Sequence, residues 1–379
     1  TNYDVLLVER EDAFGGVLKN ANKIKSINDQ PADEWLEKTE RLIRNSNNIK
    51  ILKNTLVTTY NFSDHLIALE DKNVGKPQDN EKPELVLHKI RTKHTILANG
   101  HIERFITFRN NDLPGVMLAA SFEKYLNRYG VVPDESPVIF TNNSSTFSLL
   151  KSLTDLGHKP KAYVDIRDQK NIEKQTLELL EKFNIPFYPK SEIEGCEGKK
   201  EVKKVSIRTK KNQITKIKTS MLCVSGGFNP DIHLFTQSKG LLKWDKDHLT
   251  FKPDRIFQKT ITLGSVSGNF SYEKLLVEVE KKLSEFEGLN ELEVKFELNG
   301  PEKFQIKELW ETKHQKKSLW SKSFIDLQND VTTKDLRQAV NEGFNRIEHL
   351  KRFTTNSMGT DQGKILSLIH ISEPTRPSR

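Results

Sequence analysis

The first residues of the chain constrain its fold most strongly. The apolar run Val5-Leu6-Leu7-Val8 stands between polar neighbours and ends at Glu9, with Gly15-Gly16 close behind. A short apolar run of this kind predicts a buried parallel strand. In dinucleotide-binding βαβ units, an acidic side chain at the end of the second strand accepts hydrogen bonds from the adenosine ribose, about twenty residues after a Gly-rich phosphate loop. We therefore expect Glu9 to contact a nucleotide ribose.

No phosphate loop precedes Glu9 in this sequence. The chain begins at Thr1, without a Met and without a Gly-rich stretch before the strand. We expect that it is cut after the first strand and the phosphate loop of a dinucleotide-binding unit. In the alternative interpretation, Glu9 is a solvated acid at the end of a structural strand. The Gly pair and a later turn at Gly264 favour ribose binding over this alternative.

The residues up to about 100 fit the remainder of such a unit. Apolar side chains at helical spacing predict a helix over 32–44, and the strand at 49–52 follows it as a βαβ crossover requires. The strand at 94–100 ends in Asn99-Gly100, and small residues there let the backbone approach a bound nucleotide. Two more strands are predicted at 66–69 and 85–87.

A second strand, turn, helix and strand begin at about residue 137. The turn holds Asn142 and Asn143, the helix is expected at 146–156, and the second strand, at 162–165, ends in an acid. The two Asn side chains enter the space where glycines would cradle a pyrophosphate. We therefore expect a Rossmann-like module that is kept for architecture and does not hold a dinucleotide tightly. The apolar run at 221–225 then returns the chain to the first unit.

The strand and turn at 261–268 carry the second part of the expected nucleotide site. Gly264 and Ser265 follow an apolar strand there and open a helix through small residues. In two-domain flavoproteins this turn usually reads Gly-Asp, and the Asp binds the ribityl chain of FAD. Because Ser265 replaces that Asp, the turn is better suited to a nucleotide that has no ribityl group.

These patterns predict an α/β fold of the Rossmann type. We expect the architecture of flavoproteins with two dinucleotide-binding domains, with an inserted second α/β domain and a small C-terminal helical module. The expected domains are a first nucleotide-binding domain at 1–132 completed by about 221–290, an inserted domain at 133–220, and a helical module at 321–364. Thr333 is the expected N-cap of that module's first helix. Residues 365–379 lose the pattern, and we expect a non-native tail there.

Composition excludes several classes of site. The net charge of +8 comes from 60 Lys and Arg against 52 Asp and Glu, so the surface is mixed. The densest basic run, at 199–211, has no aromatic residues between its charges, which favours a solvated hairpin face over a nucleic-acid-binding surface. Cys196 and Cys223 are far apart and have no CxxC partner, so no metal site is expected. No apolar run reaches the length of a membrane span, and a cytoplasmic protein is the default.

Five sequence blocks together resemble one family. They read NDLPGVM at 111–117, YLNRYG at 125–130, DVT at 330–332, EHLKRFTT at 348–355 and MGTDQGK at 358–364. On these blocks the chain resembles the alpha subunit of heterotetrameric sarcosine oxidase, from Thr1 to about Lys364. The resemblance implies that an N-terminal ferredoxin-like domain and the phosphate loop precede this region. It also implies that a folate-binding domain follows it.

The resemblance implies an oxidoreductase that acts on the CH–NH group of a donor with oxygen as acceptor. Sarcosine would be oxidised to glycine with formaldehyde, or with methylene-tetrahydrofolate when folate is present, and hydrogen peroxide would form. The alpha subunit would hold NAD. FAD would lie in the beta subunit, FMN at the alpha–beta interface, and tetrahydrofolate in the missing C-terminal domain. Smaller gamma and delta subunits would complete the complex, and no catalytic residue is expected in this chain.

Cofactor-binding residues are carried over from the family by motif. Glu9, Arg10 and Glu11 fall at the adenosine-ribose position, and Val57 lies at the next strand. Val17 follows the Gly pair, where a hydroxyl residue is common in the family. The remaining positions expected to contact NAD are Gly15, Gly16, Leu263, Gly264, Gly268 and Phe270.

A second resemblance concerns the helical module. Residues 326–364 resemble the small iron–sulfur domain of related opine- and proline-oxidising enzymes, in which four cysteines hold the cluster. This sequence has Asp326, Gln328, Asp361 and Leu366 at the corresponding positions. Without thiolates there, no iron–sulfur cluster is expected.

Three other functions stay open at this stage. The chain could belong to another amine or opine oxidase, although the missing cysteines argue against it. It could be a non-catalytic nucleotide-binding scaffold, or a nucleic-acid-binding protein. His349 is a lone histidine in a basic helix, and a surface role is favoured over a catalytic one.

Overall fold

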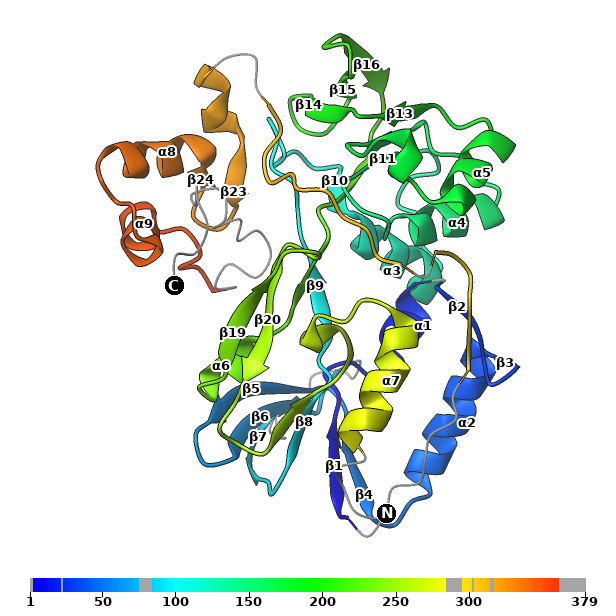
Figure 1. The fold of residues 1–379 in the computed structure, drawn as a ribbon, viewed down its shortest axis with the longest axis vertical. Coiled ribbons are helices and arrows are strands. Elements are labelled where there is room, and N and C mark those ends of the chain that lie inside the picture. Colours follow the sequence, from blue (N-terminus) through cyan, green and yellow to red (C-terminus); the bar gives the residue numbers. More distant parts are fainter. Residues whose placement is uncertain are drawn as a thin grey trace. The chain divides into compact units, whose positions relative to one another are not determined.

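The computed structural model describes residues 3–21, 23–74, 84–283, 295–301, 303–313 and 317–360. The expected tail at 365–379, Asp361 and Leu366 lie outside these residues. The chain divides into two compact units (Figure 1). Unit 1 consists of Thr1–Lys19, Lys23–His101 and Asn229–Lys303, and unit 2 consists of Asn20–Asn22, Ile102–Phe228 and Phe304–Arg379.

Unit 1 begins with the predicted crossover. Strand β1 (Val5–Val8) pairs in parallel with β4 (Ile49–Leu52), with Val5 opposite Ile49 and Val8 opposite Leu52. The predicted helix α2 (Ala32–Arg44) connects them and buries Ala32 and Leu36, whereas Leu42 is exposed. The short helix α1 (Val17–Asn20) and the strands β2 (Ile24–Ile27) and β3 (Gln30–Pro31) precede α2.

The rest of unit 1 is built from small sheets. Strands β5 (Thr55–Asn61), β6 (His65–Asp71) and β7 (Leu85–Arg91) form an antiparallel meander. Strand β8 (Thr95–Leu97) pairs in parallel with β21 (Thr260–Thr262). The other elements are α6 (His233–Gln237), the hairpin β19 (Leu241–Asp245) and β20 (Thr250–Arg255), α7 (Tyr272–Leu283), and β22 (Phe296–Leu298), which pairs with β2.

Unit 2 contains a five-stranded parallel sheet in the order β10-β17-β11-β12-β13. The strands span Val116–Leu118, Leu222–Ser225, Val138–Thr141, Ala162–Asp165 and Phe187–Pro189 in that order. They carry continuous apolar runs because helices and a second sheet cover both faces. One face packs on the helices α3 (Ala119–Tyr129), α4 (Phe147–Asp155) and α5 (Lys174–Lys182).

The opposite face of this sheet packs on a three-stranded antiparallel sheet. Its strands are β14 (Glu192–Glu197), β15 (Lys204–Arg208) and β16 (Ile214–Lys218), and Ile193, Val205 and Ile207 join the same core as Val138 and Phe140. The chain passes from unit 1 to unit 2 within strand β9 (His101–Glu103) and back to unit 1 within strand β18 (Phe228–Pro230).

The last part of unit 2 is the predicted helical module. It consists of β23 (Phe324–Asp326), β24 (Val331–Thr332), α8 (Thr333–Asn341) and α9 (Ile347–Thr354) around a small core that includes Ile325 and Leu336. Thr332 caps α8 in a capping box with Asp335. The prediction of Thr333 as the N-cap was therefore wrong by one residue.

The α/β class with parallel sheets is confirmed, whereas the domain boundaries stay a prediction. The compact units group residues 102–132 with the inserted module, because β10 pairs with β17 and α3 packs against α4. Helix α3 begins at Ala119, since Val116–Leu118 form the edge strand β10. No helix of the described residues is long and apolar enough to cross a membrane.

Candidate nucleotide-binding site

The backbone of Glu9 is fixed at the end of β1 by two hydrogen bonds. Its N–H donates to the carbonyl of Leu52 at 2.8 Å, and its carbonyl accepts from the N–H of Thr55 at 2.9 Å. The carboxylate turns back on the chain, because Oε1 accepts from the N–H of Glu11 at 2.9 Å. A carboxylate can accept about four hydrogen bonds. Glu9 therefore retains capacity for the hydroxyls of a ribose while its position is fixed.

Among the neighbours of Glu9, Arg10 is exposed and Glu11 is partly buried. The Arg10 guanidinium lies 3.3 Å from a carboxylate oxygen of Glu11, and the Arg10 side chain is 69% exposed. Val57 is partly buried in β5, which starts at Thr55 beside Glu9. An exposed ion pair of this kind contributes little to stability.

The Gly pair has a structural explanation of its own. Gly15 and Gly16 have φ values of 117° and 45°, which favour glycine. A Cβ atom on Gly15 would lie 2.5 Å from Cδ2 of Leu36, so this glycine is needed for the packing of the turn against α2. Val17 begins α1, which has only four residues. The Gly pair therefore places the chain beyond Glu9, and its presence alone does not identify a phosphate site.

The turn after β21 brings the second group of predicted residues together. Leu263 donates from its N–H to the carbonyl of Leu97 at 2.9 Å, which fixes the turn at the end of β8. Gly264 and Gly268 flank a short 3₁₀ helix with φ values of 76° and 79°. The N–H of Gly264 lies 3.3 Å from Oε2 of Glu278. Positive φ at both glycines makes their identity a requirement of the turn.

An aromatic and histidine cluster at this turn was missed by the sequence analysis. Nδ1 of His101 lies 2.9 Å from the Ser265 hydroxyl, and the rings of His101 and His248 meet Phe270 edge-on with centroid distances of 5.9 and 5.3 Å. Burial, with a smaller contribution from Lys23, lowers the pKa of His101 to about 3. The imidazole beside Ser265 is therefore neutral at physiological pH.

The carboxylate of Asp245 holds His248 of this cluster in place. His248 and Lys252 contact the carboxylate of Asp245 at 3.0 and 2.6 Å. Burial raises the pKa of Asp245, but the hydrogen bonds from Lys252 and His248 outweigh it and hold the pKa well below the usual range. No local sequence pattern predicts this cluster, because its members come from three separate segments: His101, Asp245 with His248, and Phe270.

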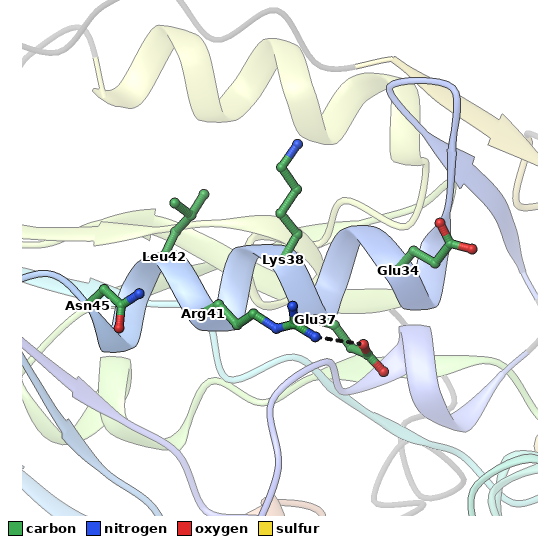
Figure 2. A pocket seen from close by; sticks show the side chains of 6 residues that line it. All are labelled: Glu34, Glu37, Lys38, Arg41, Leu42 and Asn45. Carbon is green, nitrogen blue, oxygen red and sulfur yellow. Dashed lines mark ion pairs between the residues drawn. The ribbon is translucent and has the colours of Figure 1, made fainter.

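Two surface hollows of unit 1 lie away from the predicted residues. The hollow in Figure 2 lies along α2 and is lined by Glu34, Glu37, Lys38, Arg41, Leu42 and Asn45. Arg41 pairs with Glu37 at 3.7 Å, while Lys38 and Leu42 point away from that pair (Figure 2). A second hollow borders β1, β4 and β7 and includes Val5, Leu6 and His88. Neither hollow includes Glu9 or the turn at 263–268.

In the helical module, Asp326 stands at a position where the related iron–sulfur enzymes have a cysteine, and its side chain holds the local backbone. The Asp326 carboxylate accepts from the backbone N–H groups of Gln328, Asn329 and Ser357. Within the described residues, no group of three or more His, Cys, Asp or Glu side chains could hold a metal ion. Cys196 and Cys223 are free and buried.

Comparison with known proteins gives a consistent result. The family model "Sarcosine oxidase A3 domain" matches residues 320–375. The sarcosine oxidase alpha subunit of Rhizobium meliloti is 29% identical over 370 residues, which cover 95% of this chain and 36% of the relative. The same subunit of Corynebacterium sp. strain U-96 is 28% identical over 377 residues, 95% of this chain and 38% of the relative.

The chain is similar to sarcosine oxidase alpha subunits. The subunit of Corynebacterium sp. strain P-1 agrees, at 26% identity over 376 residues. The chain spans little more than a third of the length of these curated relatives, because the matched region makes up 36 to 38% of each of them. The resemblance stated from the sequence blocks is therefore confirmed over almost all of this chain.

Solved structures show the same fold class. L-proline dehydrogenase from P. horikoshii matches 97% of this chain and 68% of its own, with a TM-score of 0.64 and 20% identity. Thioredoxin reductase from T. acidophilum matches 71% of this chain and 91% of its own, with a TM-score of 0.50 and 14% identity. Both are oxidoreductases by name, and at these identities the likeness concerns the fold alone.

Proposed function

We propose that the chain is the central part of an alpha-type subunit of a sarcosine-oxidase-like complex. The observation that carries the proposal is the similarity to three alpha subunits over 95% of the chain. The reaction is the oxidative demethylation of sarcosine to glycine, with formaldehyde or methylene-tetrahydrofolate and hydrogen peroxide as the other products. The chain has no catalytic residue of its own in this proposal, and it works in the cytoplasm.

The proposal assigns the other cofactors to other parts of the complex. FAD belongs to the beta subunit and FMN to the alpha–beta interface. Tetrahydrofolate belongs to a domain C-terminal to this region. Gamma and delta subunits complete the assembly.

The role proposed for this chain is to hold NAD in unit 1 and to support the flavin-bearing beta subunit. Glu9 fits the adenosine ribose, because its backbone is fixed and its carboxylate keeps acceptor capacity. Arg10, Glu11, Gly15, Gly16, Val17 and Val57 line the same end of β1 in this proposal, and Leu263, Gly264, Gly268 and Phe270 line the turn after β21. The hydroxyls and phosphates of bound NAD would need hydrogen-bond donors and acceptors from these residues. The proposal assigns no hydride transfer to this NAD.

Ser265 supports a preference for NAD over FAD. Its hydroxyl is already paired with the neutral His101, and it carries no negative charge toward a ribityl chain. Within the part of the chain that the structure describes, β1 pairs with β4 alone, and we propose that its other side pairs with a further strand in the complete subunit. A strand with one parallel neighbour leaves about half of its backbone groups facing away from that neighbour.

The experiment uses the full-length complex. Sarcosine-dependent peroxide formation by the flavin-loaded complex tests the activity, and no peroxide from sarcosine would refute it. Peroxide from another secondary amine, but not from sarcosine, would favour a different amine oxidase.

The NAD assignment is tested by substitution of Glu9. Glu9→Ala should weaken NAD retention about 10- to 100-fold, the effect of losing hydrogen bonds to a charged acceptor. Glu9→Gln keeps an oxygen for the N–H of Glu11 and should have a smaller effect. Glu34→Ala removes an exposed acid on α2 and is the matched control. NAD content after gel filtration is the measurement, and equal content in wild type and Glu9→Ala would contradict the assignment.

A further inference from the structure

The parallel sheet of unit 2 has a topological switch point that the chain fills with its own residues. Strands β11 and β17 are neighbours in the sheet, with β12 and β13 beyond β11 and with β10 beyond β17. In open α/β sheets, ligands bind in the crevice outside the carboxyl ends of the strands at such a point. Here the crevice lies between Asn142-Asn143, after β11, and Ser225-Gly226, at the end of β17.

Asn143 bridges the two strands across this crevice. Its Nδ2 donates to the carbonyl of Ser225 at 3.2 Å and lies 3.1 Å from the Ser225 hydroxyl, and the side chain is fully buried. The N–H of Asn142 also donates to the Ser225 carbonyl, at 3.3 Å. A glycine at position 143 would leave this space open to a pyrophosphate. The Asn side chain closes it instead.

A second layer of closure comes from residues 304–307, which we name the crossing segment. The N–H of Ser144 donates to the carbonyl of Gln305 at 3.0 Å, and the N–H of Gln305 donates to the Ser144 hydroxyl at 2.9 Å. The N–H of Lys307 donates to the carbonyl of Asn142 at 2.9 Å. Ile306 and Asn143 form an antiparallel bridge. The crossing segment therefore occupies the N–H of Ser144, a donor of the turn on which a dinucleotide phosphate would depend.

Side chains of the crossing segment extend this contact to both neighbouring strands. Nζ of Lys307 donates to the carbonyl of Ile166, just after β12, at 3.1 Å. A Cβ atom on Gly227 would lie 2.5 Å from Cδ1 of Ile306, so the Ile306 side chain packs directly on the glycine that follows β17. The segment thus lies across the ends of β11, β12 and β17 together.

Asp165, the acid at the end of β12, is also paired within the chain. Asp165 is fully buried, and Arg167 contacts its two oxygens at distances of 2.8 to 3.1 Å. The same guanidinium donates to the carbonyl of Asn143 at 3.1 Å and pairs with Glu173 at 3.0 Å. In a working dinucleotide site this acid would accept from the ribose hydroxyls. Here Arg167 takes that place.

We propose that the crossing segment is a built-in occupant of this crevice, which stands where a dinucleotide would bind and closes unit 2 to nicotinamide and flavin dinucleotides. The proposal concerns unit 2 and is independent of the NAD site proposed for unit 1. The five-stranded module then serves as a rigid support, and its nucleotide geometry is satisfied from within the chain.

Hydrogen exchange of the assembled full-length protein tests this proposal. Exchange is measured without nucleotide and with NAD⁺, NADH, NADPH or FAD at millimolar concentration. Amides in 141–146 and 304–309 should show less than a twofold change with every nucleotide. Loss of protection in 304–309 together with new protection in 141–146 would overturn the proposal, because it would show a displaceable lid over a working site. Changes in 5–18 and 263–270 report on the NAD site of unit 1 and leave this result unaffected.

A matched pair of variants tests whether the crossing segment is held by its backbone. Gln305→Pro removes the N–H that donates to Ser144, whereas Gln305→Ala keeps it. Amide exchange in 142–146 should rise about five- to tenfold in Gln305→Pro, the loss expected for one hydrogen bond, and should stay at the wild-type rate in Gln305→Ala. Equal exchange in the two variants would show that the segment does not close the crevice.

Discussion

The carboxylate of Asp326 is the main tie between the two loops of the helical module. Oδ1 accepts from the N–H groups of Gln328 and Asn329 at 2.8 and 3.1 Å, and Oδ2 accepts from Nδ2 of Asn329 and the N–H of Ser357 at 3.1 and 2.8 Å. Asp326 is 5% exposed. The bond to Ser357 joins the loop after β23 to the loop after α9.

Removing this acceptor should destabilise unit 2. Hydrogen bonds to charged groups contribute about 1.5–3 kcal/mol each and are not additive, so Asp326→Ala should lower the free energy of unfolding by about 3–4 kcal/mol. Asp326→Asn keeps one oxygen but presents an NH₂ group to N–H donors, and should lower it by about 2 kcal/mol. At roughly 2–4 °C per kcal/mol for a unit of this size, Asp326→Ala should lower Tm by about 6–16 °C.

The effect should depend on pH with a definite sign. Burial raises the pKa of Asp326, but the hydrogen bonds from Asn329, Ser357 and Gln328 outweigh it and hold the pKa below the usual value. A carboxyl group whose folded-state pKa is lowered adds stability above its unfolded pKa of about 3.9, and this stability is lost as pH falls through the folded value. The difference in stability between wild type and Asp326→Asn should be constant above about pH 5 and shrink below about pH 4.

The assay combines thermal unfolding with hydrogen exchange at Gln328, Asn329 and Ser357. Asp330→Asn is the control, because Asp330 is exposed with φ of 53°, a conformation that Asn tolerates. The control should stay within about 0.5 kcal/mol of wild type. An Asp326→Asn variant as stable as the control, with unchanged exchange at Ser357, would refute the reasoning.

Two further predictions concern buried groups of unit 2. Arg167→Met should lower the free energy of unfolding by about 3–5 kcal/mol, because it leaves the carboxylates of Asp165 and Glu173 buried without their guanidinium; a urea midpoint equal to that of wild type would contradict this. Burial raises the pKa of Cys196 to about 12 and that of Cys223 well above its usual value, so neither thiol should react with a disulfide reagent before the protein unfolds. Rapid reaction of one thiol in the folded protein would disprove the prediction.

The sequence predicted the central strands of the unit 2 sheet and missed a hairpin of unit 1. Strands β11, β12 and β17 were found because parallel strands covered on both sides carry uninterrupted apolar runs. The hairpin of β19 and β20 was missed because charged and polar residues interrupt its segments, as in Leu241-Leu242-Lys243-Trp244-Asp245. In the structure Trp244 pairs with Phe251 across this hairpin, and the two rings are in contact.

The candidate site divides in the same way. Glu9 was predictable because an acid at a strand end is a local pattern, and the structure fixes it at the end of β1. His101 and His248 were not, since their convergence on Phe270 depends on three separate segments. The edge strand β10 was not predicted, because a three-residue apolar run has no period of its own and pairing with β17 decides its conformation.

The two pairs of glycines in unit 1 carry different weight for the proposed nucleotide site. Gly15 is required by the Leu36 side chain, so packing explains it without a ligand. Gly264 and Gly268 frame a turn in which Ser265 meets the neutral imidazole of His101. A carboxylate at position 265 would stand beside a histidine whose protonation burial opposes, and the pair would have to bear the cost of a buried charge. The proposed preference for NAD over FAD thus rests on the His101–Ser265 contact more than on the Gly pair near the start of the chain.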